Sequence, residues 1–396
     1  MMKKIVVIGV LFFMLSGTTC TFSLDDSSKT KIDRISIAKN HVIIEVAILD
    51  SVIPSFASPS EMEKILNGYA WSSRNSSYGF ETRFVTDMQI SMGALDGCDL
   101  ILIPGIGKEF RRPVDNSWLL RWKNEVKAFV SNGGGYLGTC GGANIASQGL
   151  VSASERGWTG ETAWEWFMNK SAIGIVPVRA YQDMGDPMAC SIIQKNPARI
   201  GQSAYVWYNL SIEGSGVCQH CRINREHPIF RGYKYDTRII RWVGGPALIP
   251  DGNNVTILAW YPDENISRPN GNRSTSIHAW RYNFDPMEPF DLWDMESKLI
   301  ETHLAGKPAA IACEYGKGRV VIFGNHPEHP VWSGGRIVEK DTCSNSMLFK
   351  GLFQWEERQS LLPSFNWWIV RRSVAWAAGV PAEELPPMSP FCNKFY

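Results

Sequence analysis

A glycine-rich stretch around Cys140 constrains the fold of this chain more than any other feature. A short apolar run, Tyr136–Thr139, leads directly into the cysteine, which has Gly138 before it and Gly141-Gly142 after it. This G-x-C-x-G order is typical of a nucleophile elbow, in which a strand turns sharply into a helix and the nucleophile sits at the apex. Glycine is required at the flanking positions because a side chain there would collide with the neighbouring strand and helix.

The chemistry of the elbow has two interpretations. At the apex, the Cys140 sulfur would face the first turn of the following helix, where unpaired N–H groups and the helix dipole favour a thiolate. The N–H of Gly141 would then point to where an oxyanion forms. Against this, glycine-rich turns occur in many α/β proteins that catalyse nothing, and a buried cysteine often serves as a small apolar residue. The elbow alone leaves catalysis and structure equally open.

Apolar strands alternate with amphipathic helices on the N-terminal side of the elbow. Val42–Asp50, Phe80–Thr86 and Asp99–Gly105 have the composition of strands in a buried sheet. A capping box at Ser58–Glu61 predicts the start of one helix, and apolar residues at helical spacing predict another over 116–131. Such alternation indicates a parallel sheet covered on both faces. We therefore expect an α/β fold with three layers, α/β/α, around a mostly parallel, flavodoxin-like sheet.

The turn Gly105-Ile106-Gly107 ends the third of these strands. Open α/β sheets form their sites beyond the carboxyl ends of strands, and the elbow lies at the same edge. An N–H from this turn is therefore a candidate second oxyanion donor, beside the N–H of Gly141. The alternative is an ordinary tight turn.

A histidine and a glutamate follow another predicted strand. Residues 309–324 have the pattern of a hairpin, and its second strand leads to His326-Pro327-Glu328. The proline favours an extended backbone at His326, so that residues two apart project to the same side. Glu328 can then orient the imidazole, whose other nitrogen is free to take a thiol proton. With the cysteine, these two are the predicted catalytic residues, and His329 is a competing base that lacks a carboxylate two residues further on.

The middle of the chain has a looser pattern. Ile173–Val178 is predicted to be a returning strand. Residues from about 181 to 300 are predicted to be a β-rich elaboration on the sheet rather than an independent domain, with short β-like runs at Ile239–Val243 and Val255–Trp260. The chain thus divides into a core that carries the motifs and an insertion.

Cys218 and Cys221 form the one close cysteine pair. No second ligand pair lies at zinc-finger spacing, so a local disulfide or free thiols are favoured over half of a zinc site. We expect neither a metal nor another cofactor.

The first twenty residues have the order of a secretory signal. Lys3 and Lys4 precede an apolar run that small and polar residues follow. We therefore expect export to an extracellular, cell-surface or periplasmic location, with a signal peptide at 1–20, a linker at 21–40, one domain at 41–396 and no stable membrane span after signal removal. A lipid anchor at Cys20 is disfavoured because Gly17 and Thr19 fit an attachment site poorly. Six N-x-S/T sequons agree with export: Asn75, Asn169, Asn209, Asn254, Asn265 and Asn272.

The charge balance excludes one class of partner. The chain is 44% hydrophobic and 20% charged, with a formal net charge of +1. It therefore lacks the basic surplus typical of nucleic-acid binding, and we expect no nucleic-acid partner.

Three motifs together resemble the class I glutamine amidotransferase-like superfamily, namely the elbow Gly138–Gly142, the turn Pro104–Gly107 and His326-Pro327-Glu328. Within that superfamily, Gly133–Ala143 and Gly316–Glu328 are most similar to a domain found at the N-terminus of eukaryotic biotin–protein ligases and in stand-alone bacterial and archaeal proteins. The resemblance covers roughly residues 42–180 and 300–380 of the sequence.

The resemblance implies a Cys140 nucleophile, a His326 base and a Glu328 orienter, with oxyanion donors from Gly141 and from the turn Gly105–Gly107. The family reaction is attack on a side-chain amide, release of ammonia and hydrolysis of a thioester. The expected substrate is a small amide, a γ-glutamyl compound or a peptide. No synthetase partner that would receive ammonia is evident, and no biotin-ligase catalytic domain is present, so ligation is not predicted.

Three functions stay open at this level. The first is an exported, cysteine-dependent amide hydrolase. The second is a non-catalytic surface protein that retains the fold and binds a glycan or a peptide, which the tryptophan-rich middle and the sequons would suit. The third is a redox role for Cys140 or for the Cys218/Cys221 pair.

Overall fold

The structure is a computed structural model, and the residues it describes all fall between 39 and 396. The described ranges are 40–50, 58–74, 76–105, 121–152, 169–181, 205–207, 217–242, 245–263, 276–283, 294–301, 304–339 and 353–388. The predicted signal peptide and all but the last residue of the predicted linker lie outside them. No helix within these ranges has the length and apolar character needed to cross a membrane.

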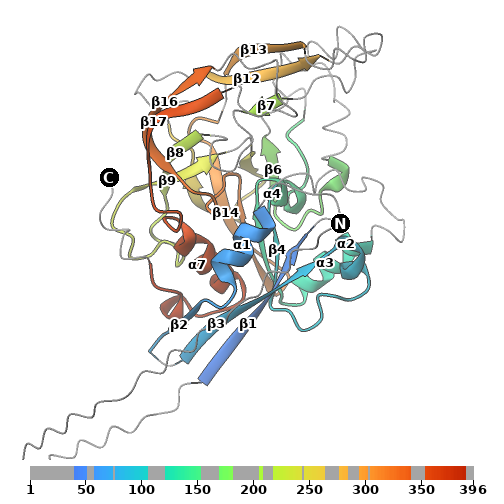
Figure 1. The fold of residues 1–396 in the computed structure, drawn as a ribbon. Coiled ribbons are helices and arrows are strands. Elements are labelled where there is room, and N and C mark those ends of the chain that lie inside the picture. The colour runs from blue at the N-terminus through green and yellow to red at the C-terminus, as the bar shows by residue number, and fades with distance from the viewer. Residues whose placement is uncertain are drawn as a thin grey trace, which may run out of the picture. The chain divides into compact units, whose positions relative to one another are not determined.

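A ten-stranded sheet forms the centre of the fold, in the order β2-β3-β1-β4-β5-β15-β14-β11-β8-β9. Figure 1 labels β1 to β4, β8, β9 and β14 of this sheet. The α/β class is confirmed. The five strands β3-β1-β4-β5-β15 pair in parallel, whereas the other pairings are antiparallel, so the sheet as a whole is mixed. The strands span β1 Asn40–Leu49, β2 Ala70–Ser72, β3 Ser76–Val85, β4 Leu100–Ile103, β5 Gly135–Thr139, β8 Val217–Ile223, β9 Thr237–Trp242, β11 Thr256–Trp260, β14 Pro308–Tyr315 and β15 Gly318–Phe323.

Helices cover both faces of the parallel half, as the alternation of strands and helices predicts. Successive residues of a strand point to opposite faces: Val46 and Ile48 of β1 pack in the core cluster with α1 and α7. Ala47 and Leu49 pack in the other cluster, with α2, α3 and α4. The helices span α1 Ser58–Leu66, α2 Asp87–Ser91, α3 Arg121–Ser131, α4 Gly141–Ala146 and α7 Trp367–Ala377, and a short 3₁₀ turn, η5, spans Ala382–Glu384.

The predicted β-rich elaboration continues the central sheet through β8, β9 and β11. Three smaller sheets accompany it. They pair β6 (Val178–Tyr181) with β10 (Ala247–Pro250), β12 (Ser276–Asn283) with both β7 (Tyr205–Trp207) and β13 (Asp294–Glu301), and β16 (Trp332–Glu339) with β17 (Phe353–Ser360).

The predicted strand at Ile173–Val178 is wrong for most of its length, since β6 begins only at Val178. The backbone N–H of Ile173 donates to the carbonyl of Ile145, and those of Ile175 and Val176 donate to Ala146. The segment therefore satisfies the open carbonyls at the end of α4 instead of pairing with a strand. Its apolar residues are buried against that helix, which is why the sequence pattern looks like a strand.

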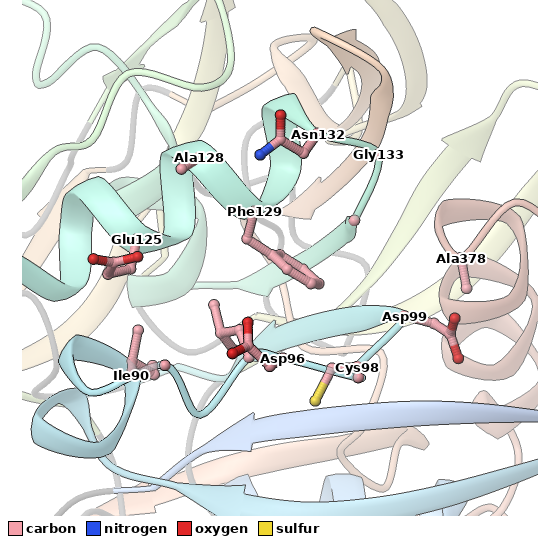
Figure 2. A pocket seen from close by; sticks show the side chains of 14 residues that line it. Ile90, Asp96, Cys98, Asp99, Glu125, Ala128, Phe129, Asn132, Gly133 and Ala378 are labelled. Carbon is pink, nitrogen blue, oxygen red and sulfur yellow. The ribbon is translucent and has the colours of Figure 1, made fainter.

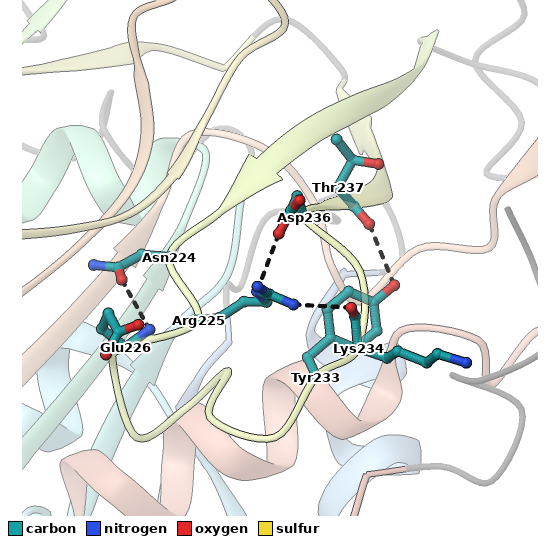
Figure 3. A network of polar contacts seen from close by, with 7 residues as sticks. All are labelled: Asn224, Arg225, Glu226, Tyr233, Lys234, Asp236 and Thr237. Carbon is teal, nitrogen blue, oxygen red and sulfur yellow. Dashed lines mark hydrogen bonds and ion pairs between the residues drawn. The ribbon is translucent and has the colours of Figure 1, made fainter.

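A polar network shapes the turn between β8 and β9 (Figure 3). The Arg225 guanidinium forms an ion pair with Asp236 at 3.1 Å and donates to the Lys234 carbonyl at 2.8 Å. From α7, the buried Arg372 donates to the Ile229 carbonyl of the same turn at 2.6 Å. The turn is thus hydrogen-bonded to the helical layer through α7.

Candidate active site

Cys140 lies between the end of β5 and the start of α4 in a sparsely populated backbone conformation with positive φ, at φ 50° and ψ −107°. Within the described ranges, the other non-glycine residue with positive φ is Glu357. Such a conformation costs about 1–3 kcal/mol and persists only where the surrounding structure enforces it. The cysteine therefore occupies the strained apex of a strand-to-helix turn, and α4 is short, with six residues.

The glycines of the elbow are required by close packing. A Cβ added at Gly142 would lie 1.8 Å from the carbonyl oxygen of Ile103 in β4, and one at Gly138 would lie 2.7 Å from the Gly142 carbonyl carbon. Both distances are far below van der Waals contact. The collision with the neighbouring strand and helix that the sequence pattern predicts is thus present.

The pairing of β5 with β15 brings the predicted site residues together. The two strands are parallel neighbours with Thr139 opposite Phe323, and the N–H of Cys140 donates to the Phe323 carbonyl at 2.7 Å. Parallel strands end at the same edge, so the residues that follow β5 and β15 emerge side by side. Beyond β15, the His326 N–H donates to the Arg241 carbonyl of β9 at 2.7 Å, which anchors the histidine segment.

His326 and Glu328 form a fully buried pair. Nδ1 of His326 lies 2.7 Å from Oε1 of Glu328, and both side chains are 0% exposed. The Thr139 hydroxyl donates to the same carboxylate oxygen at 3.0 Å. The spacing of two residues across a proline thus places the carboxylate against the imidazole.

Gly105 lies against both the cysteine and the histidine. A Cβ added there would be 2.9 Å from Cβ of Cys140 and 2.7 Å from Cε1 of His326. One point beside the Gly105 backbone therefore touches both side chains, which places three segments from distant parts of the sequence at one spot. Ile106 and Gly107, the other residues of the predicted oxyanion turn, lie outside the described residues. Gly141, the other predicted donor, is the first residue of α4.

Electrostatics favour charged forms of the pair. Burial would lower the pKa of His326, but the Glu328 carboxylate and the Cys140 thiol beside it raise that pKa to about 10. Burial would raise the pKa of Glu328, but the neighbouring imidazole lowers it to about 2. At neutral pH the site therefore holds an imidazolium against a carboxylate.

The second ring nitrogen of His326, Nε2, takes no part in the contact with Glu328. Nε2 of His326 is buried and makes no hydrogen bond of standard length and angle to any residue within the described part of the chain. The Cys140 thiol interacts with the same imidazole ring and raises its pKa. This arrangement leaves Nε2 as the atom that can exchange a proton with the sulfur.

His329 stacks on His326 instead of replacing it. The ring centroids are 4.7 Å apart and the planes differ by 17°. Burial lowers the pKa of His329 to about 3, so it is neutral at physiological pH. The hydrogen bond from the ring to the carboxylate belongs to His326, which makes His329 the weaker candidate for a base.

The two histidines and Glu328 do not make a convincing metal site, although their ligand atoms lie within 4.8 Å of one another. The lone pairs of an imidazole lie in its plane. Two nearly parallel stacked rings cannot both direct lone pairs at one ion, and Nδ1 of His326 is already hydrogen-bonded to the carboxylate.

Two residues near the pair were missed by sequence reasoning. Thr139 carries no signal beyond its place before the nucleophile. Arg241 is fully buried and influences Glu328 electrostatically. Its signal is a charged residue inside the apolar run Ile239–Val243, because a charge in a buried strand usually has a partner.

Cys218 and Cys221, the close pair in the sequence, are poorer candidates for a nucleophile. Cys218 and Cys221 are free, and three residues apart on β8 they point to opposite faces of the sheet, so a disulfide between them is excluded. Of the two interpretations left open for this pair, free thiols is the one observed. Burial raises the pKa of each to about 12, which makes both poor nucleophiles near neutral pH.

A pocket of about 450 Å³ lies at the opposite edge of the sheet, at the amino ends of β4 and β5 (Figure 2). Its lining includes Cys98, Asp99, Glu125 and Phe129. No histidine lines it, and burial raises the pKa of the Cys98 thiol. This pocket therefore lacks the nucleophile–base arrangement, and half-buried Cys98 is the natural control thiol for Cys140.

No protein-family model matches the chain, and no curated protein matches it. Similar solved structures include a glutamine amidotransferase, with a TM-score of 0.35 and 13% identity over 72% of this chain and 90% of that one. A GMP synthase subunit from Thermoplasma acidophilum has a TM-score of 0.35 and 10% identity over 85% and 94%. A ThuA-like protein from Parabacteroides merdae has a TM-score of 0.38 and 12% identity over 89% and 93%. At these scores the likenesses assign no activity to this chain.

Proposed function

We propose that this chain is an exported, cysteine-dependent amide hydrolase, in which Cys140 is the nucleophile, His326 the base and Glu328 the orienting carboxylate. One observation carries the proposal. The cysteine stands at a strained elbow beside a buried His–Glu pair, an arrangement that matches the nucleophile, base and orienter of acyl transfer. A merely structural cysteine would not need the strained backbone or a buried charged pair.

The reaction would proceed in two halves. In the first, the Cys140 proton already resides on Nε2 of the His326 imidazolium, and the Cys140 thiolate attacks the amide carbon. The C–N bond then breaks, His326 returns its proton to the leaving nitrogen, and an acyl thioester remains on Cys140. In the second half, His326 takes a proton from water, the hydroxide attacks the thioester, and the carboxylic acid leaves the regenerated thiolate.

The oxyanion formed in each half would be held by backbone N–H groups. The N–H of Gly141, directly after the nucleophile, is the first proposed donor. An N–H from the turn Gly105-Ile106-Gly107 is the second, and the contact of Gly105 with Cys140 and His326 supports it. Donors fixed in a dry site are worth far more than the same donors in water.

The proposed substrate is a small amide, a γ-glutamyl compound or a peptide. Membership of the class I glutamine amidotransferase-like superfamily, and of its biotin–protein ligase N-terminal branch, is part of the same proposal and rests on the motifs. The reaction as written requires neither a metal nor an organic cofactor, because the thiol, imidazole and carboxylate supply every proton transfer.

An electrophilic glutamine analogue tests the proposal directly. We expect it to modify Cys140 in the folded protein at a stoichiometry near one, mapped by peptide mass spectrometry. A Cys98→Ser variant should label equally, and Cys140→Ser should not label. Modification of Cys98 with no modification of Cys140 would contradict the assignment, and a glycan or peptide screen of the Cys140→Ser protein would then address the binding function.

Export is testable through the sequons. Of the two whose asparagine is described, Asn254 is exposed on the turn between β10 and β11. In the other, Asn169 is also exposed, but its amide oxygen accepts a hydrogen bond from the Leu150 N–H at 2.6 Å, and Ser171, the serine of the same sequon, is buried. Expressed with its own N-terminus in eukaryotic secretory cells, the protein should carry a glycan on Asn254 and none on Asn169.

The controls separate export from site choice. Deletion of residues 1–20 should abolish glycosylation altogether, and Asn254→Gln should lower the mass by one glycan while Asn169→Gln changes nothing. Unglycosylated full-length protein retained inside the cells would refute the signal peptide. A glycan on Asn169 would show that the folded environment does not select the acceptor.

A further inference from the structure

The side chain directly before the candidate nucleophile contacts the other end of the triad. Thr139 is the last residue of β5 and is fully buried. Its hydroxyl donates a hydrogen bond to Oε1 of Glu328 at 3.0 Å. The same oxygen is hydrogen-bonded to Nδ1 of His326 at 2.7 Å. The elbow and the histidine segment, which are distant in the sequence, are therefore joined by a side-chain hydrogen bond as well as by the backbone.

A neutral donor has a particular value at this point. A buried carboxylate is stable as an anion only if hydrogen bonds and opposite charge replace the water it has lost. The imidazole provides one such contact, but its strength changes with the protonation of the ring. The threonine hydroxyl provides a contact that does not change, because it has no charge to lose.

The same bond also sets geometry. Thr139 is covalently joined to Cys140, and Glu328 fixes the orientation of the His326 ring. The hydrogen bond from Thr139 to Glu328 therefore keeps the Cys140 sulfur and the His326 imidazole in a constant relative position as the backbone moves. Catalytic groups need such support, because a displacement of about 1 Å can cost a hundredfold in rate.

We propose that Thr139 is a positioning residue, whose hydroxyl holds the Glu328 carboxylate in place and thereby maintains the imidazolium beside Cys140. This rests on the proposed function and extends it to a residue outside the triad. The other titratable or charged groups that act on the pair are the Cys140 thiol, the stacked His329 and the Arg241 guanidinium from β9. None of these is altered by a substitution at Thr139.

The pH dependence of Cys140 alkylation by iodoacetamide tests the assignment. The variants are made in a Cys98→Ser background, and the modified peptide is quantified between pH 4 and pH 9. Without the Thr139 hydroxyl, the Glu328 carboxylate is less well placed to stabilise the His326 imidazolium. The Cys140 thiol therefore stays protonated up to a higher pH. In Thr139→Val we expect the acid limb of the profile to move up by about 0.5–1 pH unit.

A matched pair of variants, Thr139→Ser and Thr139→Ala, makes the test independent of how well a valine side chain packs at this position. Thr139→Ser keeps the hydroxyl and Thr139→Ala lacks it, and neither has the methyl group. We expect the serine variant to retain the wild-type limb and the alanine variant to show the shift. Loss of packing alone would affect both alike, and it would lower the yield of folded protein without moving the limb.

The outcomes are distinct. A wild-type limb that is unchanged in Thr139→Val and Thr139→Ala overturns the role of Thr139 and leaves the triad standing. A wild-type profile that follows that of an unfolded cysteine overturns the proposed function, and the role of Thr139 with it. A shift in the alanine variant with none in the serine variant supports the assignment.

Discussion

Replacement of His326 by asparagine is expected to slow the alkylation of Cys140 at pH 7 by about 30-fold, because an unassisted thiol with a pKa of about 8.5 is only a few per cent ionised at that pH. The imidazole has a pKa of about 10 in this site and so keeps its proton across neutral pH. The wild-type rate should therefore vary little between pH 6 and pH 9. In the variant it should climb steeply with pH, as for an unassisted thiol.

Asparagine is chosen because its amide nitrogen can take the place of Nδ1 and donate to Glu328. Alanine would leave a buried carboxylate without its main partner and would destabilise the protein for that reason alone. His227→Asn is the matched control, because the half-buried His227 ring packs against Trp376 of α7 with ring centroids 4.8 Å apart, so the change removes an imidazole at another place in the fold. Equal alkylation rates in the wild type and His326→Asn would remove His326 from the mechanism, whatever its contact with Glu328.

Replacement of Gly142 by alanine should be the most destabilising single-methyl change at the elbow. The added Cβ would lie 1.8 Å from the Ile103 carbonyl oxygen, and that oxygen belongs to the backbone of a buried strand, which cannot rotate away. Either β4 or α4 must shift. We expect the free energy of unfolding, measured by urea titration, to fall by about 4 kcal/mol.

The matched control is Gly79→Ala in β3. There the added Cβ would lie 3.3 Å from Cδ1 of Ile43, the far end of a flexible side chain, so the cost should stay below about 1 kcal/mol. Similar losses in the two variants would show that glycine is not specifically required at Gly142. If Gly142→Ala folds, the displaced α4 should also slow labelling of Cys140 by the glutamine analogue.

Local patterns in the sequence were sufficient for the parallel half of the fold. The first strand, predicted at Val42–Asp50, is β1, and the helix that opens at the capping box is α1. The hairpin predicted at residues 309–324 is β14 and β15. These elements depend on periods of two and 3.6 residues and on turn chemistry, all of which lie within a short window of sequence.

Tertiary contacts determined the structure of the segments for which local patterns give the wrong prediction or none. Ile173–Val178 has the composition of a strand, yet its N–H groups are bonded to the end of α4. The parallel sheet continues into an antiparallel half whose edge strand holds His326 through the Arg241 carbonyl. Neither outcome could be predicted, because burial alone does not specify which backbone groups a segment will pair with.

The sequence by itself determined which residues could form a nucleophile elbow and which carboxylate could reach which imidazole, since both are set by spacings of one or two residues along the backbone. Only the tertiary structure decided that these two pieces meet, and that Thr139 and Gly105 lie between them. That meeting depends on the register of β5 against β15. Strand register here is a property of two parallel segments far apart in the chain, with no tight turn between them to fix it, so it is set only when both strands bury their apolar faces in the same sheet.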